Sequence, residues 1–590
     1  MIKDCLKIFE KELARKGDAL VLDNYIPKNG TYIIVTIKKN SFVIGETVKI
    51  FYDRKNDVLE GESDIRYREL QKLDYYSKLV EMNKPIDPKK HIHSNNYLSF
   101  FVKKENLAAE RITPDTIDGY YNTLKNPFLK YANKAKTKEI YHHLAIEIGE
   151  PDIVLIERIQ KWMKENFFAL DIDVTAKDYL KIFFVFEENE KTLERYKIEG
   201  KRYLIPNIYN NNDFNINIDG EIYGVPNNNM GMNVKKPYLE HKNRKVKEPY
   251  FLNLEEVLLQ EKFFDYLMGK ASVGYVNVYI DTVEDKISFL KVNELLESFK
   301  NGIFIRIKKG KEVEIHNFDI IAGYEYYLDP EFKLKEMIEI PDKEMNRFKA
   351  GYSVKTNLKE LQHLIDEVFF GKMLCSNYFT DPEKISINDG ILKFNLLLAR
   401  ERLFNWFYKG NQIGIDALLR KISLELIKNT IENEYYIKVM HQVNLRMSLI
   451  DYFNKNSRME EIMVEARNNL RIHLDCKEDW QFESEKEYYY AVGQLIAFYI
   501  SKINSLKKPQ SLINPFLNAK SDAVIKRRLR NFYKKVNHAF EKNNLRVDNL
   551  IEHVMGYCPN SVSVDQDILI TGFVASSLIY KKKEEDNEDE

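Results

Sequence analysis

The segment Tyr488–Ile500 (YYYAVGQLIAFYI) is the longest apolar run of the chain, and only Gly493 and Gln494 interrupt it. Its 13 residues fall short of the roughly 20 that a membrane-spanning helix needs. We therefore predict a buried core helix at this position.

The sequence around this segment is typical of a helical bundle. From about Thr356 onward, apolar residues recur at three- and four-residue spacing, and no proline lies between Lys384 and Lys508. The pattern predicts helices at Leu358–Phe370, Ile391–Tyr408, Ile415–Asn429, Glu434–Asn454, Met459–Arg471, Lys486–Asn504, Ala519–Lys542 and Asp567–Tyr580. The nearly all-acidic tail, Glu584–Glu590, is predicted to be disordered.

The N-terminal part has a mixed α/β pattern. A charged, helix-favouring stretch covers Glu62–Met82, and a segment rich in Asn, Gly and Pro covers Tyr203–Pro249. That segment predicts a long functional loop, with disorder as the alternative. Strands are predicted at Tyr32–Lys38, Phe42–Tyr52, Ile182–Glu187, Gly274–Ile280, Ile303–Lys308 and Glu312–Ile315.

These patterns together predict an α+β fold in which a mixed α/β region precedes an all-α bundle. We expect an N-terminal region at 1–355, a helical connecting region at 356–455, a helical C-terminal domain at 456–583 and the tail at 584–590. A chain of 590 residues is too long for one core, since a domain has about 150 residues.

Composition excludes several classes of protein. Lys plus Arg and Asp plus Glu both total 90, so any attraction for phosphate must come from local charge segregation. The N-terminus lacks the apolar segment of a signal peptide, and the cysteines lack the spacing of a zinc site or a disulfide framework. These cysteines are Cys5, Cys375, Cys476 and Cys558. We expect a cytoplasmic protein.

The predicted helix Ala519–Lys542 has an apolar face and a cationic remainder. Eight cations are opposed only by Asp522 and Glu541, leaving six over some seven turns. A solvated face normally mixes both signs, so we predict binding to phosphates of a nucleic-acid backbone. The cations are Lys520, Lys526, Arg527, Arg528, Arg530, Lys534, Lys535 and Lys542.

Further polar clusters in the N-terminal region are candidates for contact with duplex DNA. Amides and cations together suit the reading of base edges and the fixing of register on phosphates. An ordinary polar loop, or a solubilising turn at 308–311, is the alternative. The candidates are Asn227, Asn228, Asn229, Lys235, Lys236, Lys242, Arg244, Lys308, Lys309 and Lys311.

Catalytic motifs are not found in the sequence. No P-loop, GxSxG or HExxH pattern occurs. His91 and His93 have no third metal ligand nearby, and Asp171 and Asp173 form the only carboxylate pair that suggests a metal-dependent nuclease. We predict no enzymatic activity, no cofactor and no metal, with a nuclease as the rival interpretation.

Several segments resemble one known family. Asp87–Phe101 (DPKKHIHSNNYLSFF) and Gly231–Arg244 (GMNVKKPYLEHKNR) resemble segments of the large subunit of type I-B CRISPR interference complexes, the Cascade family. The tripeptide Gly493-Gln494-Leu495 and the basic helix after it extend the likeness, as do Met555-Gly556-Tyr557 and Gly572-Phe573.

The resemblance implies a subunit without nuclease activity in an RNA-guided surveillance complex. Such a subunit reads the short motif (PAM) beside the target, helps to open double-stranded DNA, stabilises the R-loop and holds the displaced strand. Its partners would be the guide RNA, the backbone, guide-processing and small subunits, and a helicase-nuclease recruited in trans. Asn95 and Asn96 join the motif-reading candidates through this resemblance.

Two further expectations follow from the resemblance. Some relatives carry a cysteine-paired zinc module, which the isolated Cys375 and Cys476 cannot build. The helical C-terminal part resembles a small subunit that is made separately by internal translation initiation, here near Met447, Met459 or Met463. An RNA-binding scaffold that never contacts duplex DNA remains a third alternative.

Overall fold

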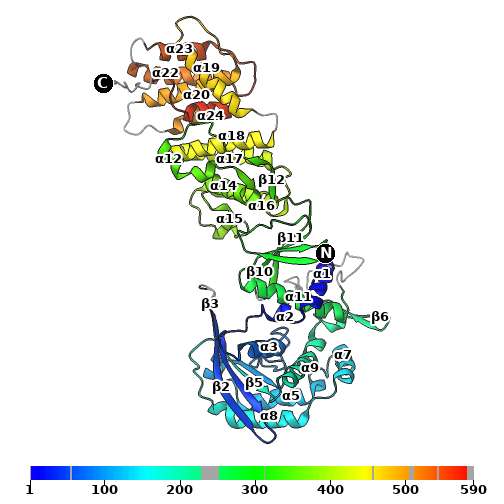
Figure 1. Cartoon of the computed structure of the whole chain (residues 1–590). Coiled ribbons are helices and arrows are strands. Elements are labelled where there is room, and N and C mark those ends of the chain that lie inside the picture. Colours follow the sequence, from blue (N-terminus) through cyan, green and yellow to red (C-terminus); the bar gives the residue numbers. More distant parts are fainter. Residues whose placement is uncertain are drawn as a thin grey trace, which may run out of the picture. The chain divides into compact units, whose positions relative to one another are not determined.

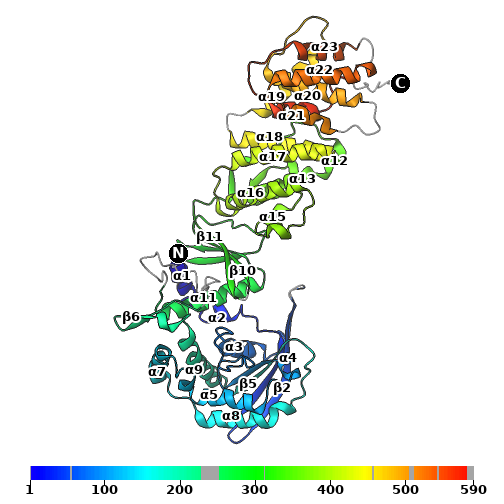
Figure 2. The same cartoon turned by 180° about the vertical axis from the view of Figure 1, so that it is seen from behind.

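The computed structural model describes residues 2–53, 56, 58–227, 251–310, 312–454, 458–503, 510–540 and 544–580. The chain forms two compact units, which Figures 1 and 2 show from opposite sides. Unit 1 comprises residues 1–291 and 302–320, and unit 2 comprises residues 292–301 and 321–590.

Unit 1 is built first on a five-stranded sheet with helices on both faces. Phe184 of the sheet packs edge-on against Trp162 of α8 (Ile153–Asn166), whereas the neighbouring Phe183 faces Tyr196 of α9 (Asn189–Asn207). Only the β1–β5 pair is parallel among the pairs that form this sheet in the described chain. In sheet order the strands are β3 (Val58–Glu60), β2 (Phe42–Asp53), β1 (Gly30–Ile37), β5 (Tyr179–Val185) and β4 (Ser99–Lys103).

A second, four-stranded sheet in unit 1 packs against α1 (Ile2–Lys16) and α11 (Leu254–Ser272). Phe9 of α1 and Phe263 of α11 are buried with Val278 and Ile305 of the sheet. In sheet order the strands are β11 (Val313–Ala322), β10 (Asn301–Lys309), β8 (Asn277–Asp281) and β9 (Lys286–Leu290).

Charged side chains connect these two parts of unit 1. Asp265 of α11 accepts hydrogen bonds from Lys78 at 2.6 Å and from the Tyr75 hydroxyl at 2.8 Å. Asp18 is held by Lys262 at 2.9 Å and Lys197 at 3.2 Å. These contacts add polar interactions to the apolar packing of α3 (Tyr67–Ser77) and α9 on α11.

Unit 2 contains the predicted helical bundle. A single hydrophobic cluster includes Met337, Val443, Leu470 and Leu495, so the core runs across the domain boundary expected at residue 455. Its principal helices are α14 (Leu358–Phe370), α16 (Gly390–Lys409), α17 (Ile415–Glu432), α18 (Tyr436–Phe453), α19 (Met459–His473), α20 (Glu485–Ser501), α22 (Asp522–Val536), α23 (Leu545–Gly556) and α24 (Gln566–Val574).

The apolar segment 488–500 forms α20, which crosses α24 at very close range. A Cβ atom at Gly493 would overlap the carbonyl oxygen of Leu569 and lie 2.6 Å from the amide nitrogen of Phe573. A Cβ atom at Gly572 would overlap the carbonyl oxygen of Tyr490 in turn. Only glycine at both positions allows the two backbones to approach this closely.

The side-chain amide of Gln494 adds hydrogen bonds between α20 and the C-terminal end of α24 inside the core. Its amide nitrogen donates to the carbonyl oxygen of Gly572 at 2.5 Å, and its amide oxygen accepts from the backbone nitrogen of Leu578 at 2.9 Å. The last carbonyls of a helix lack partners within the helix, and Gln494 supplies one for α24. The two residues that interrupt the apolar run, Gly493 and Gln494, therefore both contact α24 directly.

The α+β class predicted from the sequence is confirmed. None of the helices in the described part of the chain is long and apolar enough to cross a bilayer. Three helix predictions need correction: α23 was not predicted, the helix expected at Ala519–Lys542 spans Asp522–Val536, and the helix expected at Asp567–Tyr580 ends at Val574. The acidic tail lies outside the described residues.

The domain boundary expected at residue 355 also needs correction. Strand β12 (Tyr327–Phe332) pairs with β13 (Lys355–Asn357), and the Ile338 backbone nitrogen donates to Asn444 of α18 at 2.8 Å. Residues 321–355 therefore belong to the helical unit. The Asn-rich segment also has more regular structure than expected, because β6 (Ile216–Ile218) and β7 (Glu221–Tyr223) form a hairpin within it.

Replacing Gly493 by alanine should lower the free energy of unfolding of unit 2 by about 1–3 kcal/mol, as overpacking of a core does. In a helix without close neighbours, Gly→Ala instead stabilises by up to about 1 kcal/mol. The sign of the change in the free energy of unfolding therefore shows whether the crossing is close. Urea unfolding followed by tryptophan fluorescence measures it. Gly556→Ala is the matched control, because no atom lies within 4 Å of the added Cβ; equal stability of both variants would contradict the close crossing.

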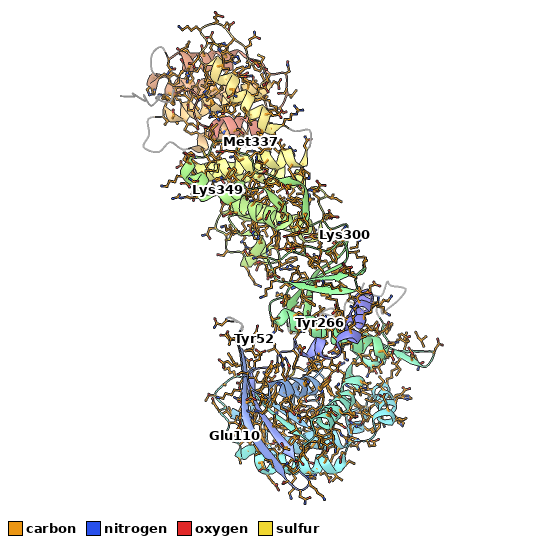
Figure 3. The ribbon with its side chains drawn as sticks, in the orientation of Figure 1. Tyr52, Glu110, Tyr266, Lys300, Met337 and Lys349 are labelled. Carbon is orange, nitrogen blue, oxygen red and sulfur yellow. The ribbon has the colours of Figure 1, made fainter. Side chains whose placement is uncertain are left out.

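Asp18 should make unit 1 sensitive to acid. Burial alone raises its pKa, but hydrogen bonds from Lys262, Tyr76 and Lys197 outweigh burial and lower the pKa to about 2. Because the pKa is depressed in the folded state, ionised Asp18 stabilises the fold at pH values above its ordinary pKa near 4. This stabilisation is lost as the pH falls toward 2. Unfolding of Asp18→Asn should therefore depend less on pH across that window. Glu110→Gln, an exposed position labelled in Figure 3, should retain the full dependence.

Candidate nucleic-acid interface

Helix α22 is seated on α20 by both apolar and polar contacts. Ile525 and Leu529 are buried in the common core. Asp522, in the first turn of α22, accepts a hydrogen bond from the Tyr488 hydroxyl of α20 and forms an ion pair with Lys526, whose Nζ lies 3.1 Å away. Burial, followed by the Asp522 carboxylate, raises the pKa of Tyr488. The phenol therefore keeps the proton that it donates.

The packing of α22 on α20 places one of the predicted phosphate ligands, Lys526, away from the exposed cationic face. The Lys526 side chain is only 12% exposed, and its ammonium also donates to the backbone carbonyl of Tyr557. Lys526 therefore anchors α22 within unit 2, and we withdraw it as a phosphate ligand. Arg528 is half-buried, with one guanidinium nitrogen inaccessible to solvent. Lys542 lies outside the described residues.

The outward face of α22 carries the remaining cations. Arg527, Arg530 and Lys534 are exposed at positions i, i+3 and i+7, so they line one side of the helix over about 10 Å. Within the described ranges, no carboxylate forms an ion pair with any of the three. Lys535 is exposed on the flank, and Lys520 is exposed just before the helix. Such a row suits several consecutive phosphates of one strand.

The structure places Asn95 and Asn96 in the interior of unit 1, at 5% and 1% exposure. The Asn95 amide donates to the carbonyl oxygens of Tyr76 and Lys78 at 2.9 and 3.1 Å. The Asn96 amide donates to the Asn95 side-chain oxygen and accepts from the Leu98 backbone nitrogen. Because these amides are engaged inside the fold, we withdraw both residues as readers of base edges.

The other N-terminal candidates have varied environments. Asn227 is buried, and its backbone nitrogen donates to the carbonyl oxygen of Ile208. Lys308 is exposed and Lys309 is half-buried at the end of β10, where a turn leads into β11 as predicted. Seven candidates lie outside the described residues, namely Asn228, Asn229, Lys235, Lys236, Lys242, Arg244 and Lys311.

The carboxylate pair that suggested a nuclease does not gather with other ligands. Asp173 accepts hydrogen bonds from the backbone nitrogen and the hydroxyl of Thr175 at 3.0 and 2.6 Å, and these bonds lower its pKa. Both Asp171 and Asp173 are exposed. Across the described ranges, no group of three or more His, Cys, Asp or Glu side chains is arranged to hold a metal ion.

One exposed aromatic residue beside the cationic face was missed at the sequence level. Tyr533 is 37% exposed on α22 and directly precedes Lys534 and Lys535. The amphipathic pattern predicted for Ala519–Lys542 considered only an apolar face and a set of cations, so Tyr533 had no role in it. The signal that could have found it is an aromatic ring that lies off the apolar stripe and among cations.

No family model, curated protein or solved structure matches the chain.

Asn96→Ala should lower the free energy of unfolding of unit 1 by about 1–3 kcal/mol, because it leaves buried hydrogen-bonding groups without a partner. Chemical denaturation provides the measurement. Asn40→Ala, at an exposed turn between β1 and β2, should change stability by less than about 0.5 kcal/mol. If Asn96→Ala left stability intact but altered DNA sequence preference, the base-reading role would be restored.

Proposed function

We propose that this chain is a non-catalytic nucleic-acid-binding subunit, and that the outward face of α22 holds a phosphate backbone. The observation that carries the proposal is the row of Arg527, Arg530 and Lys534, which are exposed and lack ion-pair partners within the described ranges. The acid of the same helix, Asp522, is engaged on the inner side. With no net charge on the whole chain, this local segregation supplies the attraction.

Within this class, we propose the large subunit of a type I-B CRISPR surveillance complex. The support is the sequence resemblance of Asp87–Phe101, Gly231–Arg244 and the segments around Gly493 and Gly572. In this assignment the chain works in the cytoplasm with a guide RNA and with backbone, guide-processing and small subunits. It binds double-stranded target DNA, stabilises the displaced strand, and recruits a helicase-nuclease that performs the cleavage.

We propose that unit 1 reads the flanking motif. Base discrimination needs side chains that reach groove edges, whereas phosphate contacts only fix position. Asn227, at 2% exposure, is withdrawn together with Asn95 and Asn96, and the described candidates with exposed or half-buried side chains are Lys308 and Lys309. Asn228, Asn229, Lys235, Lys236, Lys242, Arg244 and Lys311 remain candidates by sequence.

We also propose that a shorter product begins inside the helical unit. Met459 is the first residue of α19, so a chain that starts there retains α20, α22 and α24. It loses α18, whose Arg446 forms an ion pair with Asp567 of α24 at 2.8 Å. A start at Met447 would cut through α18, whereas one at Met463 would remove the first turn of α19. Mass spectrometry of the complex made from the native gene would reveal such a product.

The alternatives differ from the proposed subunit in activity and in ligand preference. A metal-dependent nuclease would cleave plasmid DNA with Mg²⁺ or Mn²⁺ and would lose that activity in Asp171→Ala. An RNA-binding scaffold would be displaced by RNA and not by duplex DNA in a competition assay. The proposed subunit binds DNA without cleaving it, and its affinity falls as salt is added.

Reversing the charge of Arg527, Arg530 and Lys534 to Glu should weaken DNA binding by the full chain for every sequence tested. The slope of log affinity against log salt concentration should fall by about 0.9 for each duplex phosphate contact that is lost. Fluorescence anisotropy with a labelled duplex at several salt concentrations measures both quantities.

The matched control reverses three exposed lysines elsewhere in unit 2, Lys333, Lys349 and Lys421, of which Lys349 is labelled in Figure 3. It changes net charge equally and should leave the slope nearly unchanged. Equal slopes for wild type and the α22 variant would remove this helix from the interface.

A further inference from the structure

Four aromatic rings form a continuous row beside the cationic face of α22. Successive ring centroids are 5.7 Å apart from Tyr533 to Phe540, 5.2 Å from Phe540 to Phe498, and 6.1 Å from Phe498 to Tyr580. The rings come from α22, from the segment after it, from α20 and from the C-terminal end of the described chain. Residues separated by up to 82 positions in sequence, from Phe498 to Tyr580, are thus brought into contact.

The two ends of this row are open to solvent. Tyr533 is 37% exposed and Tyr580 is 47% exposed, while Phe540 is half-buried and Phe498 is buried beneath them. Tyr499 lies behind the row, with its ring stacked on Phe540 at 5.9 Å. The core of unit 2 therefore fixes the positions of the outer rings, which are preorganised for contact with a ligand.

Cations border the row at both ends. Lys534 and Lys535 follow Tyr533, and the Lys502 ammonium lies 5.2 Å from the Phe498 ring and 5.4 Å from the Tyr580 ring. No acidic residue occurs in the flanking segments 498–503 and 533–540. Among the described residues, the charges that border the rings are therefore cations, a combination that suits flat bases joined by phosphates.

We propose that the exposed rings of this row, Tyr533 and Tyr580, held in place by Phe540 and Phe498, are stacking platforms for the bases of single-stranded nucleic acid. The inference rests on the proposed function, because the neighbouring cations of α22 hold the backbone of the same strand. Every base has a π-face, so the platform binds strands of any sequence. Bases in a duplex are already stacked and paired, and the rings therefore discriminate single strands from duplex.

The test compares three labelled probes of about 16 nucleotides, which is the upper end of site sizes for single strands. The probes are an oligothymidine strand, an abasic strand of equal length, and a duplex. Tyr533→Ala/Tyr580→Ala in the full chain should lower affinity for oligothymidine at least about fivefold, the lower end for loss of a stacked ring. Affinity for the abasic strand and the duplex should stay at the wild-type value.

Two matched variants complete the test. Tyr533→Phe/Tyr580→Phe keeps both rings and should retain wild-type affinity for oligothymidine. Tyr327→Ala/Tyr435→Ala removes two exposed tyrosines elsewhere in unit 2 and should have no effect on any probe. Circular dichroism and thermal unfolding should report the same fold for all variants, since the substituted rings are partly exposed.

The platform is overturned if oligothymidine affinity is unchanged in Tyr533→Ala/Tyr580→Ala, or if the abasic strand loses affinity by the same factor. Failure of the proposed function gives a different result, because the Arg527→Glu/Arg530→Glu/Lys534→Glu variant would then keep the wild-type salt slope on every probe. The ring variant removes no charge, so its own salt slope should equal that of wild type.

Discussion

The contact on which unit 2 depends most is the crossing of α20 and α24 at Gly493 and Gly572. Two helix backbones approach there to a distance that no side chain would allow. Gln494 then ties α20 to the C-terminal end of α24 through the carbonyl of Gly572. Because α20 lies in the middle of the core, this single crossing determines where its other side chains can support neighbouring helices.

The candidate interface is built on that support. Tyr488 at one end of α20 binds Asp522 of α22, and Phe498 and Tyr499 at the other end lie beneath the aromatic row. The inner side of α22 therefore engages its one described carboxylate, Asp522, and one lysine, Lys526. The outer side is left with cations alone. Although the whole chain has no net charge, the exposed side of this one helix carries positive charge, because its carboxylate lies on the inner side.

Local sequence patterns predicted most of unit 2 because its helices are amphipathic or fully apolar over many turns. The bounds predicted for Leu358–Phe370 agree with those of α14. The predictions failed where distant contacts decide the structure. The pairing of β12 with β13 moved the unit boundary, and the burial of Asn95 and Asn96 depends on carbonyl groups of α3 and the residue after it. The cationic helix was foreseen, but Lys526 was misplaced because its partner, the Tyr557 carbonyl, is 31 positions away.

The most direct measurement of the central claim is photo-crosslinking of the full chain to a single strand that carries 5-bromodeoxyuridine, followed by mass spectrometry of the attached peptides. The account predicts that crosslinks concentrate in peptides from residues 526–540 and around Tyr580, and that they diminish at high salt. Crosslinks confined to other surfaces, with none in these peptides at low salt, would contradict the assignment of α22 as the nucleic-acid interface.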